Sequence, residues 1–323
     1  MTRFSRVLGQ DVAVTILERA IASDRVASSY LFEGPAGVGK KLAAMALADA
    51  VIGGTGSVSR RIEEGSHPDV RVFLPREEGK RNIPVDFLRQ QILPFAQFAP
   101  FEARAAFLIF PEADVSFPEA PSESANALLK TLEEPRPNVH FILLSERPDR
   151  LLPTIRSRCQ RVRFGRLPAA VLHALLEARG VGEEARDAAV ALADGRVDRA
   201  LELADGGALE LLEQAIAIDD AVTAGGPGAL VRLGEELARG EQPLEGVLEA
   251  LTGYYRDVAA AALGLPDTSL AHRHHAARIR ERAELLGAAR AARRVELLAE
   301  TRFSFERNAN PEIALDALLF ALR

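Results

Sequence analysis

The chain has 323 residues and a formal net charge of −6, so its length allows about two or three domains and nucleic-acid contact requires a local basic patch. Its single cysteine excludes an internal disulfide and a cysteine-rich metal site. No apolar run approaches the ~18 residues of a membrane span, and the N-terminus lacks a signal-peptide core, so we expect a cytoplasmic protein without membrane contact.

The first half of the chain alternates apolar runs with helical patterns. The run "SSYLFEG" predicts a buried strand that ends at Gly34, and a helix that stops at Gly53 follows the glycine-rich loop. This alternation predicts an α/β domain with a parallel sheet covered on both faces. Further strands are predicted over 69–75, 104–110 and 139–145, and helices over 11–24, 83–98 and 122–134.

After about Phe164 the pattern is helical only. Short helices separated by glycines extend to about residue 207, and longer amphipathic helices follow to the end. Asn310 and Pro311 suit the first turn of the last helix. We therefore predict three domains, namely an α/β domain at 1–164, a small helical domain at 165–207 and an all-α domain at 208–323.

The stretch "EGPAGVGKK" has the spacing of a phosphate loop. Gly34, Gly39 and Lys40 match G-x-x-x-x-G-K, and Gly37 lies between them. Backbone N–H groups of such a loop and the helix N-terminus behind it form an anion cradle. The hydroxyl residue that holds magnesium should follow, but Lys41 stands there. A plain strand-to-helix turn is the alternative interpretation.

A second metal-organising group is also absent. In phosphate-loop ATPases a buried strand ends in an Asp that positions the metal ion. The strand "AAFLIF" is followed instead by Pro111, and then by Glu112. Glu112 could polarise water, but it would lack an ordered magnesium. The absence of both metal-organising groups indicates that this chain no longer hydrolyses ATP.

Residues 126–164 carry a family resemblance. "NALLKTLEEP", the strand "HFILL" and the tripeptide Ser157-Arg158-Cys159 resemble the clamp-loader branch of the AAA+ ATPases. The N-terminal "VLGQ…GVGK" and the terminal "NANPEIALDALLFAL" are similar to the same family, so the resemblance spans nearly the whole chain. It implies an AAA+ P-loop domain, a helical lid and a helical collar through which subunits oligomerise.

The resemblance also implies roles for single residues. Arg158, with Ser157 and Cys159 of the SRC motif, would be an arginine finger that reaches into a neighbouring subunit's ATP site. Guanidinium suits this role because it is planar, permanently charged and bidentate toward phosphate. The alternative is a surface arginine in an Arg-rich chain.

Ser145 and Glu146 fall where active motors of this family place a small polar ATP sensor. Asp198 falls at the position of their Arg sensor, with Arg199 one place off, which again fits an inactive site.

The implied function is that of a clamp-loader subunit without ATPase activity of its own. It would supply the finger in trans during ATP-dependent loading of the sliding clamp onto primed DNA. The implied partners are motor ATPase subunits of the gamma/tau type, the delta subunit, the clamp and primer–template DNA. An active AAA+ motor that uses Glu112, an AAA+ interaction protein outside replication, and a scaffold without a working finger remain alternatives.

We expect no cofactor. Many family members hold zinc with four cysteines after the loop helix. Residues 51–70 contain no cysteine, and His67 is the only candidate zinc ligand there. We expect a short Gly/Ser loop in place of the zinc-binding segment. ATP or phosphate binding at Gly34, Gly37, Gly39 and Lys40 is expected to be weak or absent.

Three further stretches invite a binding interpretation. For "HRHH", residues 272–275, a solvated polar helix is favoured over a metal site, since no carboxylate stands at ligand spacing. Tyr254-Tyr255-Arg256 is interpreted as a packed helix face rather than a nucleic-acid patch. The basic stretch "RSRCQRVRF" around Arg158 could also face DNA phosphates.

Overall fold

The computed structural model describes residues 3–75, 82–118, 123–205, 207–240, 244–307 and 309–323. The chain divides into two compact units, Met1–Pro168 and Ala169–Arg323. Apart from residues 165–168, the predicted lid and collar both fall within the second unit, so the separation of 165–207 from 208–323 stays a prediction.

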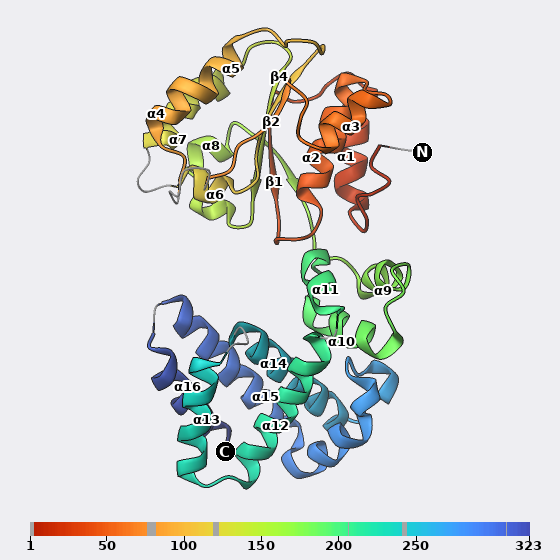
Figure 1. The fold of residues 1–323 in the computed structure, drawn as a ribbon, viewed down its shortest axis with the longest axis vertical. Helices are drawn as coiled ribbons and strands as arrows, with labels where there is room; N and C mark the ends of the chain where they lie inside the picture. Colours follow the sequence, from red (N-terminus) through yellow and green to blue (C-terminus); the bar gives the residue numbers. More distant parts are fainter. Residues whose placement is uncertain (1–2, 76–81, 119–122, 206, 241–243, 308) are drawn as a thin grey trace. The chain divides into compact units, whose positions relative to one another are not determined.

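The described part of the first unit contains a five-stranded sheet in the order β2-β3-β4-β1-β5, and all its neighbouring strands are parallel. Strands β1, β3 and β4 are buried along their whole length, as expected for a parallel sheet with covered faces. Helices α1, α2 and α3 lie on one side of the sheet, and α4, α5 and α7 lie on the other (Figure 1). The predicted α/β domain is thus confirmed. The strands are β1 Ser29–Glu33, β2 Val70–Val72, β3 Ala106–Phe110, β4 Val139–Ser145 and β5 Gln160–Arg163.

Three features of this unit differ from the sequence prediction. Helix α3 occupies the stretch predicted as a Gly/Ser loop, and buried Ile62 anchors it. The predicted helix over 83–98 forms as one contiguous run, but its middle part is the π-helical turn η1, and Pro94 stands near the start of α5. Strand β5 was missed because only Val162 of its residues is buried. The helices are α1 Asp11–Ala22, α2 Lys40–Ile52, α3 Ser57–Glu63, α4 Val85–Phe87, η1 Leu88–Ile92, α5 Leu93–Gln97, α6 Ala113–Ser116, α7 Glu123–Glu133, η2 Pro148–Arg150 and α8 Pro153–Arg156.

The regular elements in the described part of the second unit are all helices. Tyr254 and Tyr255 of α14 are fully buried, which confirms the packed-face interpretation of this stretch. The polar helix predicted at 272–275 is instead the short turn η4, and His272 is buried against Asp257. The helices are α9 Ala169–Glu177, α10 Glu183–Ala193, α11 Val197–Leu203, α12 Gly207–Ala224, α13 Pro227–Arg239, α14 Leu244–Ala262, η3 Asp267–Ser269, η4 Arg273–His275, α15 Ala276–Glu306 and α16 Pro311–Leu322.

A charged cluster lies inside this helical unit. The Asp219 carboxylate on α12 accepts hydrogen bonds from the Tyr255 hydroxyl at 2.7 Å and from Arg294 at 3.0 Å. Arg282 adds an ion pair to the same carboxylate at 2.7 Å. The cluster therefore ties α12 and α14 to α15 through buried polar groups.

Among the helices that the structure describes, none has the length and apolar character to cross a membrane.

Candidate phosphate loop and arginine finger

The predicted phosphate loop lies between β1 and α2, at the carboxyl edge of the sheet. Gly39 is the N-cap of α2 in the left-handed conformation, with φ of 94°. Gly34 has φ of 151°, and a Cβ there would lie 2.1 Å from the carbonyl oxygen of Phe164. The loop backbone thus has the shape that only glycine allows at these two positions.

Lys40 folds back onto the loop itself. Its Nζ donates to the carbonyl oxygen of Gly34 at 2.6 Å and to that of Pro35, and the side chain is buried. The ammonium group that would hold a nucleotide phosphate in this motif therefore lies against loop carbonyls.

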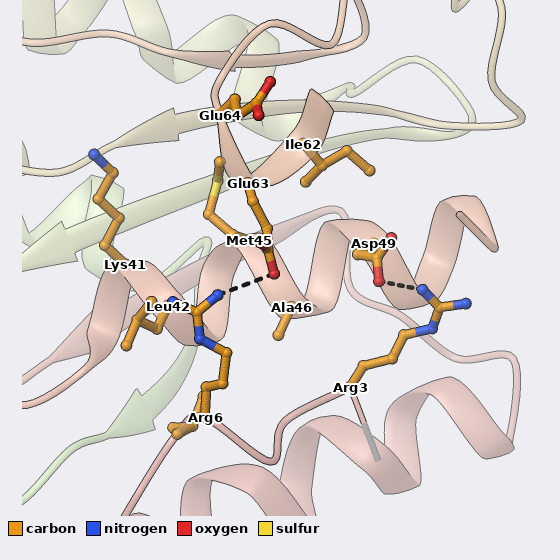
Figure 2. Close-up of a pocket in the computed structure, with 11 residues that line it drawn as sticks. Arg3, Arg6, Lys41, Leu42, Met45, Ala46, Asp49, Ile62, Glu63 and Glu64 are labelled. Atoms are coloured by element: carbon orange, nitrogen blue, oxygen red, sulfur yellow. Dashed lines mark hydrogen bonds and ion pairs between the residues drawn. The ribbon is translucent and has the colours of Figure 1, made fainter. Parts of the chain in front are cut away.

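Lys41 occupies the first turn of α2 in place of the magnesium-binding hydroxyl. Its exposed side chain lines a cleft of about 480 Å³ beside α2. In Figure 2, Lys41 extends along one side of this cleft, while Arg6 and Arg3 reach Glu63 and Asp49. The cleft thus has charges of both signs around an apolar floor that includes Met45 and Ile62.

The ends of β3 and β4 carry the other predicted positions. Pro111 follows β3 directly, so the strand ends without a carboxylate. Ser145 ends β4 opposite Glu33, and its carbonyl accepts the N–H of Gly34 at 3.1 Å. The structure therefore brings the phosphate loop and Ser145 together, as parallel strands require. Glu146 is exposed, and its N–H donates to Asp114 at 3.3 Å.

Sequence reasoning missed Glu33, although it ends the strand before the loop. Its buried carboxylate pairs with Arg161 at 2.6 Å and with Arg163 at 2.8 Å, both on β5. Burial raises the pKa of this carboxyl, but the hydrogen bonds and charges of the two arginines outweigh burial and hold the pKa below its ordinary value. The alternation of Arg161 and Arg163 was the available sequence signal for a charged strand face.

Gln10 is a second residue that the sequence did not single out. Its Nε2 donates to the carbonyl oxygens of Val38 at 3.2 Å and Gly165 at 2.7 Å. Its Oε1 accepts the N–H of Gly165 at 3.0 Å. One buried amide therefore joins the phosphate loop to the segment that follows β5.

The three residues of the SRC motif have different environments. Cys159 is in the core, and burial raises the pKa of its thiol to about 12. The Ser157 hydroxyl donates to the carbonyl of Thr154 at 3.1 Å. Arg158 lies at the surface between α8 and β5, donates to the same carbonyl at 2.8 Å, and forms an ion pair with Glu133 at the end of α7.

The remaining predicted positions have local partners. Asp198 lies in the first turn of α11 and pairs with Arg196 at 3.1 Å. His67 is buried, accepts the N–H of Asp69 at 3.1 Å, and faces Glu102 at 3.1 Å. His67 therefore serves the packing of its own loop.

Comparison with known proteins places this geometry in a family. Residues 9–168 match the family model described as DNA polymerase III, delta subunit. A Bacillus subtilis DNA polymerase III subunit delta' is 33% identical over 177 residues, which are 52% of this chain and 51% of the relative. The Pseudomonas aeruginosa subunit delta' is 37% identical over 142 residues, 41% of this chain and 42% of the relative. The Bacillus subtilis subunit tau is 30% identical over 294 residues, 79% of this chain and 50% of the relative.

The sheet order, with a phosphate loop between β1 and α2, defines a P-loop-type α/β domain, and the matches make this class that of DNA polymerase III subunits. Within this class, the chain belongs to the delta-prime family. The chain spans about half the length of the curated relatives it matches.

Proposed function

We propose that this chain is a clamp-loader subunit that does not hydrolyse ATP and that offers Arg158 in trans to a neighbouring motor subunit. The position of Arg158 carries the proposal. Its side chain is 32% exposed and pairs with Glu133, which is itself 47% exposed. Exposed ion pairs contribute only about 0–1 kcal/mol, so a triphosphate can displace Glu133 at small cost.

Three observations support the loss of hydrolysis. Lys41 replaces the magnesium-binding hydroxyl, and Pro111 replaces the carboxylate at the end of β3. Lys40 hydrogen-bonds to its own loop. The loop retains an anion cradle, but magnesium lacks the ligands that usually orient it. We therefore infer weak or absent nucleotide binding and no turnover by this chain.

The proposed partners follow from the same family. They are motor subunits of the gamma/tau type, the delta subunit, the sliding clamp and primer–template DNA, in the bacterial cytoplasm. Relatives named tau and gamma/tau match much of the chain, which supports a shared assembly. We assign the lid to residues 165–207 and the oligomerising collar to residues 208–323.

Reconstitution tests this function. The purified chain alone should hydrolyse no ATP above a blank. Motor and delta subunits should load the clamp onto primed DNA only when this chain is added. ATP turnover by the isolated chain would favour an active motor instead, and undiminished loading without the chain would remove it from the loader.

A further inference from the structure

Three side chains of metal-ligand type meet in the second unit, and a fourth, His173, lies beside one of them. His173 comes from α9, Glu183 and Asp187 from α10, and His274 from η4. Glu183 and Asp187 are four residues apart and so share one face of their helix. Ligand atoms of Glu183, Asp187 and His274 all lie within 4.8 Å of one another.

The distances suit a small tetrahedral ion. Asp187 Oδ2 lies 3.1 Å from His274 Nε2, and Asp187 Oδ1 lies 3.6 Å from His173 Nδ1. Zinc bonds of ~2.0–2.1 Å in tetrahedral geometry place neighbouring ligand atoms about 3.3 Å apart. The His274 distance is close to that value, while His173 lies slightly farther away and faces the other oxygen of Asp187.

Asp187 supplies an independent observation. The residue is only 6% exposed, and its Oδ1 has no hydrogen-bond donor in the described structure. A buried carboxylate oxygen without a donor is costly. A cation bound at this oxygen would remove that cost.

Arg273 now provides part of the positive charge. Its Nε lies 2.6 Å from Asp187 Oδ2, and its Nη2 lies 2.8 Å from Glu183 Oε1. The Arg273 side chain is 41% exposed, so it can turn into solvent when an ion enters. A divalent ion would then neutralise the two carboxylates.

We propose that Glu183, Asp187 and His274 form a zinc site, with His173, which faces the other oxygen of Asp187, as the fourth ligand. Two imidazoles favour zinc over calcium or magnesium, which take oxygen ligands. From the sequence, a metal site at residues 272–275 is disfavoured for lack of a nearby carboxylate, because the carboxylates lie 87 and 91 residues before His274 and only the fold brings them together. Bound zinc links α9 and α10 to the turn that precedes α15.

To test the site, the full, untagged chain is first treated with a chelator to remove bound metal. It then competes for zinc with a chromogenic indicator. The wild type should take up one zinc ion per chain. His274→Gln and Asp187→Asn should weaken zinc binding by more than about tenfold, a loss seen even for groups that only support a ligand. Arg273→Ala should tighten binding by about two- to fivefold, because a competing exposed ion pair is gone.

His275→Gln is the matched control, since His275 is in the same turn but outside the cluster. It should bind zinc as the wild type does. Three results would overturn the proposal: no stoichiometric uptake by the wild type, equal loss in His275→Gln and His274→Gln, or weaker binding in Arg273→Ala. The His274 side chain is 34% exposed, so His274→Gln should leave the fold intact. This variant therefore decides the question even if Asp187→Asn does not fold.

Discussion

Asp219 carries the only negative charge that the described contacts give to two buried arginines, Arg282 and Arg294. Removing one partner of a buried ion pair leaves an uncompensated charge, which costs about 3–5 kcal/mol. We expect Asp219→Asn to lower the free energy of unfolding by that amount, measured by urea denaturation followed by circular dichroism.

The neighbouring Asp220 gives a matched control. Its side chain is 55% exposed and pairs with Arg278, which is 41% exposed. Asp220→Asn should therefore cost less than about 1 kcal/mol. Equal effects of the two substitutions would contradict the account of the buried cluster.

Glu33 should make the stability of the first unit depend on pH. The folded-state pKa of its carboxyl is below the ordinary value, so the unfolded chain binds the proton more tightly. The stabilisation is then fully present above the unfolded pKa, ~4.3, and is lost as pH falls through the folded pKa. Glu33→Gln should be less stable than wild type at pH 7, and the difference should shrink with acid in pH-dependent unfolding curves.

Glu63 serves as the comparison for this pH series. It is 60% exposed and pairs with Arg6, which is 67% exposed. Glu63→Gln should change stability little at any pH, because exposed pairs are screened by water and salt. A Glu33→Gln defect that stays constant down to acid pH would show that its cause is packing and not charge.

At the scale of elements, the phosphate loop is fixed by its contact with the end of β5. A Cβ at Gly34 would meet the backbone of Phe164, which has no flexible end to yield. We expect Gly34→Ala to destabilise the first unit by about 3 kcal/mol or more, measured by thermal unfolding.

Gly53 is the appropriate control for this substitution. It also has a positive φ, 75°, but a Cβ there would meet nothing within 4 Å. Gly53→Ala should therefore cost only the backbone strain of about 1–2 kcal/mol. If both variants lose equal stability, close packing of the loop against β5 is not what fixes its shape.

The elements also show which features sequence could predict. Continuous apolar runs gave β1, β3 and β4, because buried parallel strands have no polar alternation to obscure them. Strand β5 was missed because Gln160, Arg161 and Arg163 are exposed at the sheet edge. The loop glycines were predictable from spacing, since backbone shape demands them.

The rest of the site depends on distant partners. Nothing local indicates that Gln10 bonds to Gly165, 155 residues later, or that Arg158 pairs with Glu133. The same holds for Asp187 and His274, which meet only through helix packing. Single-sequence reasoning identifies residue types and periods, whereas these contacts depend on tertiary structure.

At the scale of the whole molecule, the chain combines a phosphate loop, Lys41 and Pro111 at the two metal-organising positions, and a surface arginine on a short turn. Buried Cys159 and Ile155 anchor that turn in the core, while Arg158 stays at the surface. The proposed role of Arg158 in trans rests on this arrangement.

The most direct test is the DNA- and clamp-stimulated ATPase rate of the reconstituted loader with Arg158→Ala in this chain. Arg156→Ala, on the same turn, is the matched control, and assembly is checked for both variants by size-exclusion chromatography. Arginine fingers contribute about 10³–10⁵ in rate at a single site, so the Arg158 variant should assemble normally and lose the turnover of the site it serves, while the Arg156 variant keeps it. Wild-type turnover in an assembled Arg158→Ala loader would contradict the account and leave this subunit a scaffold.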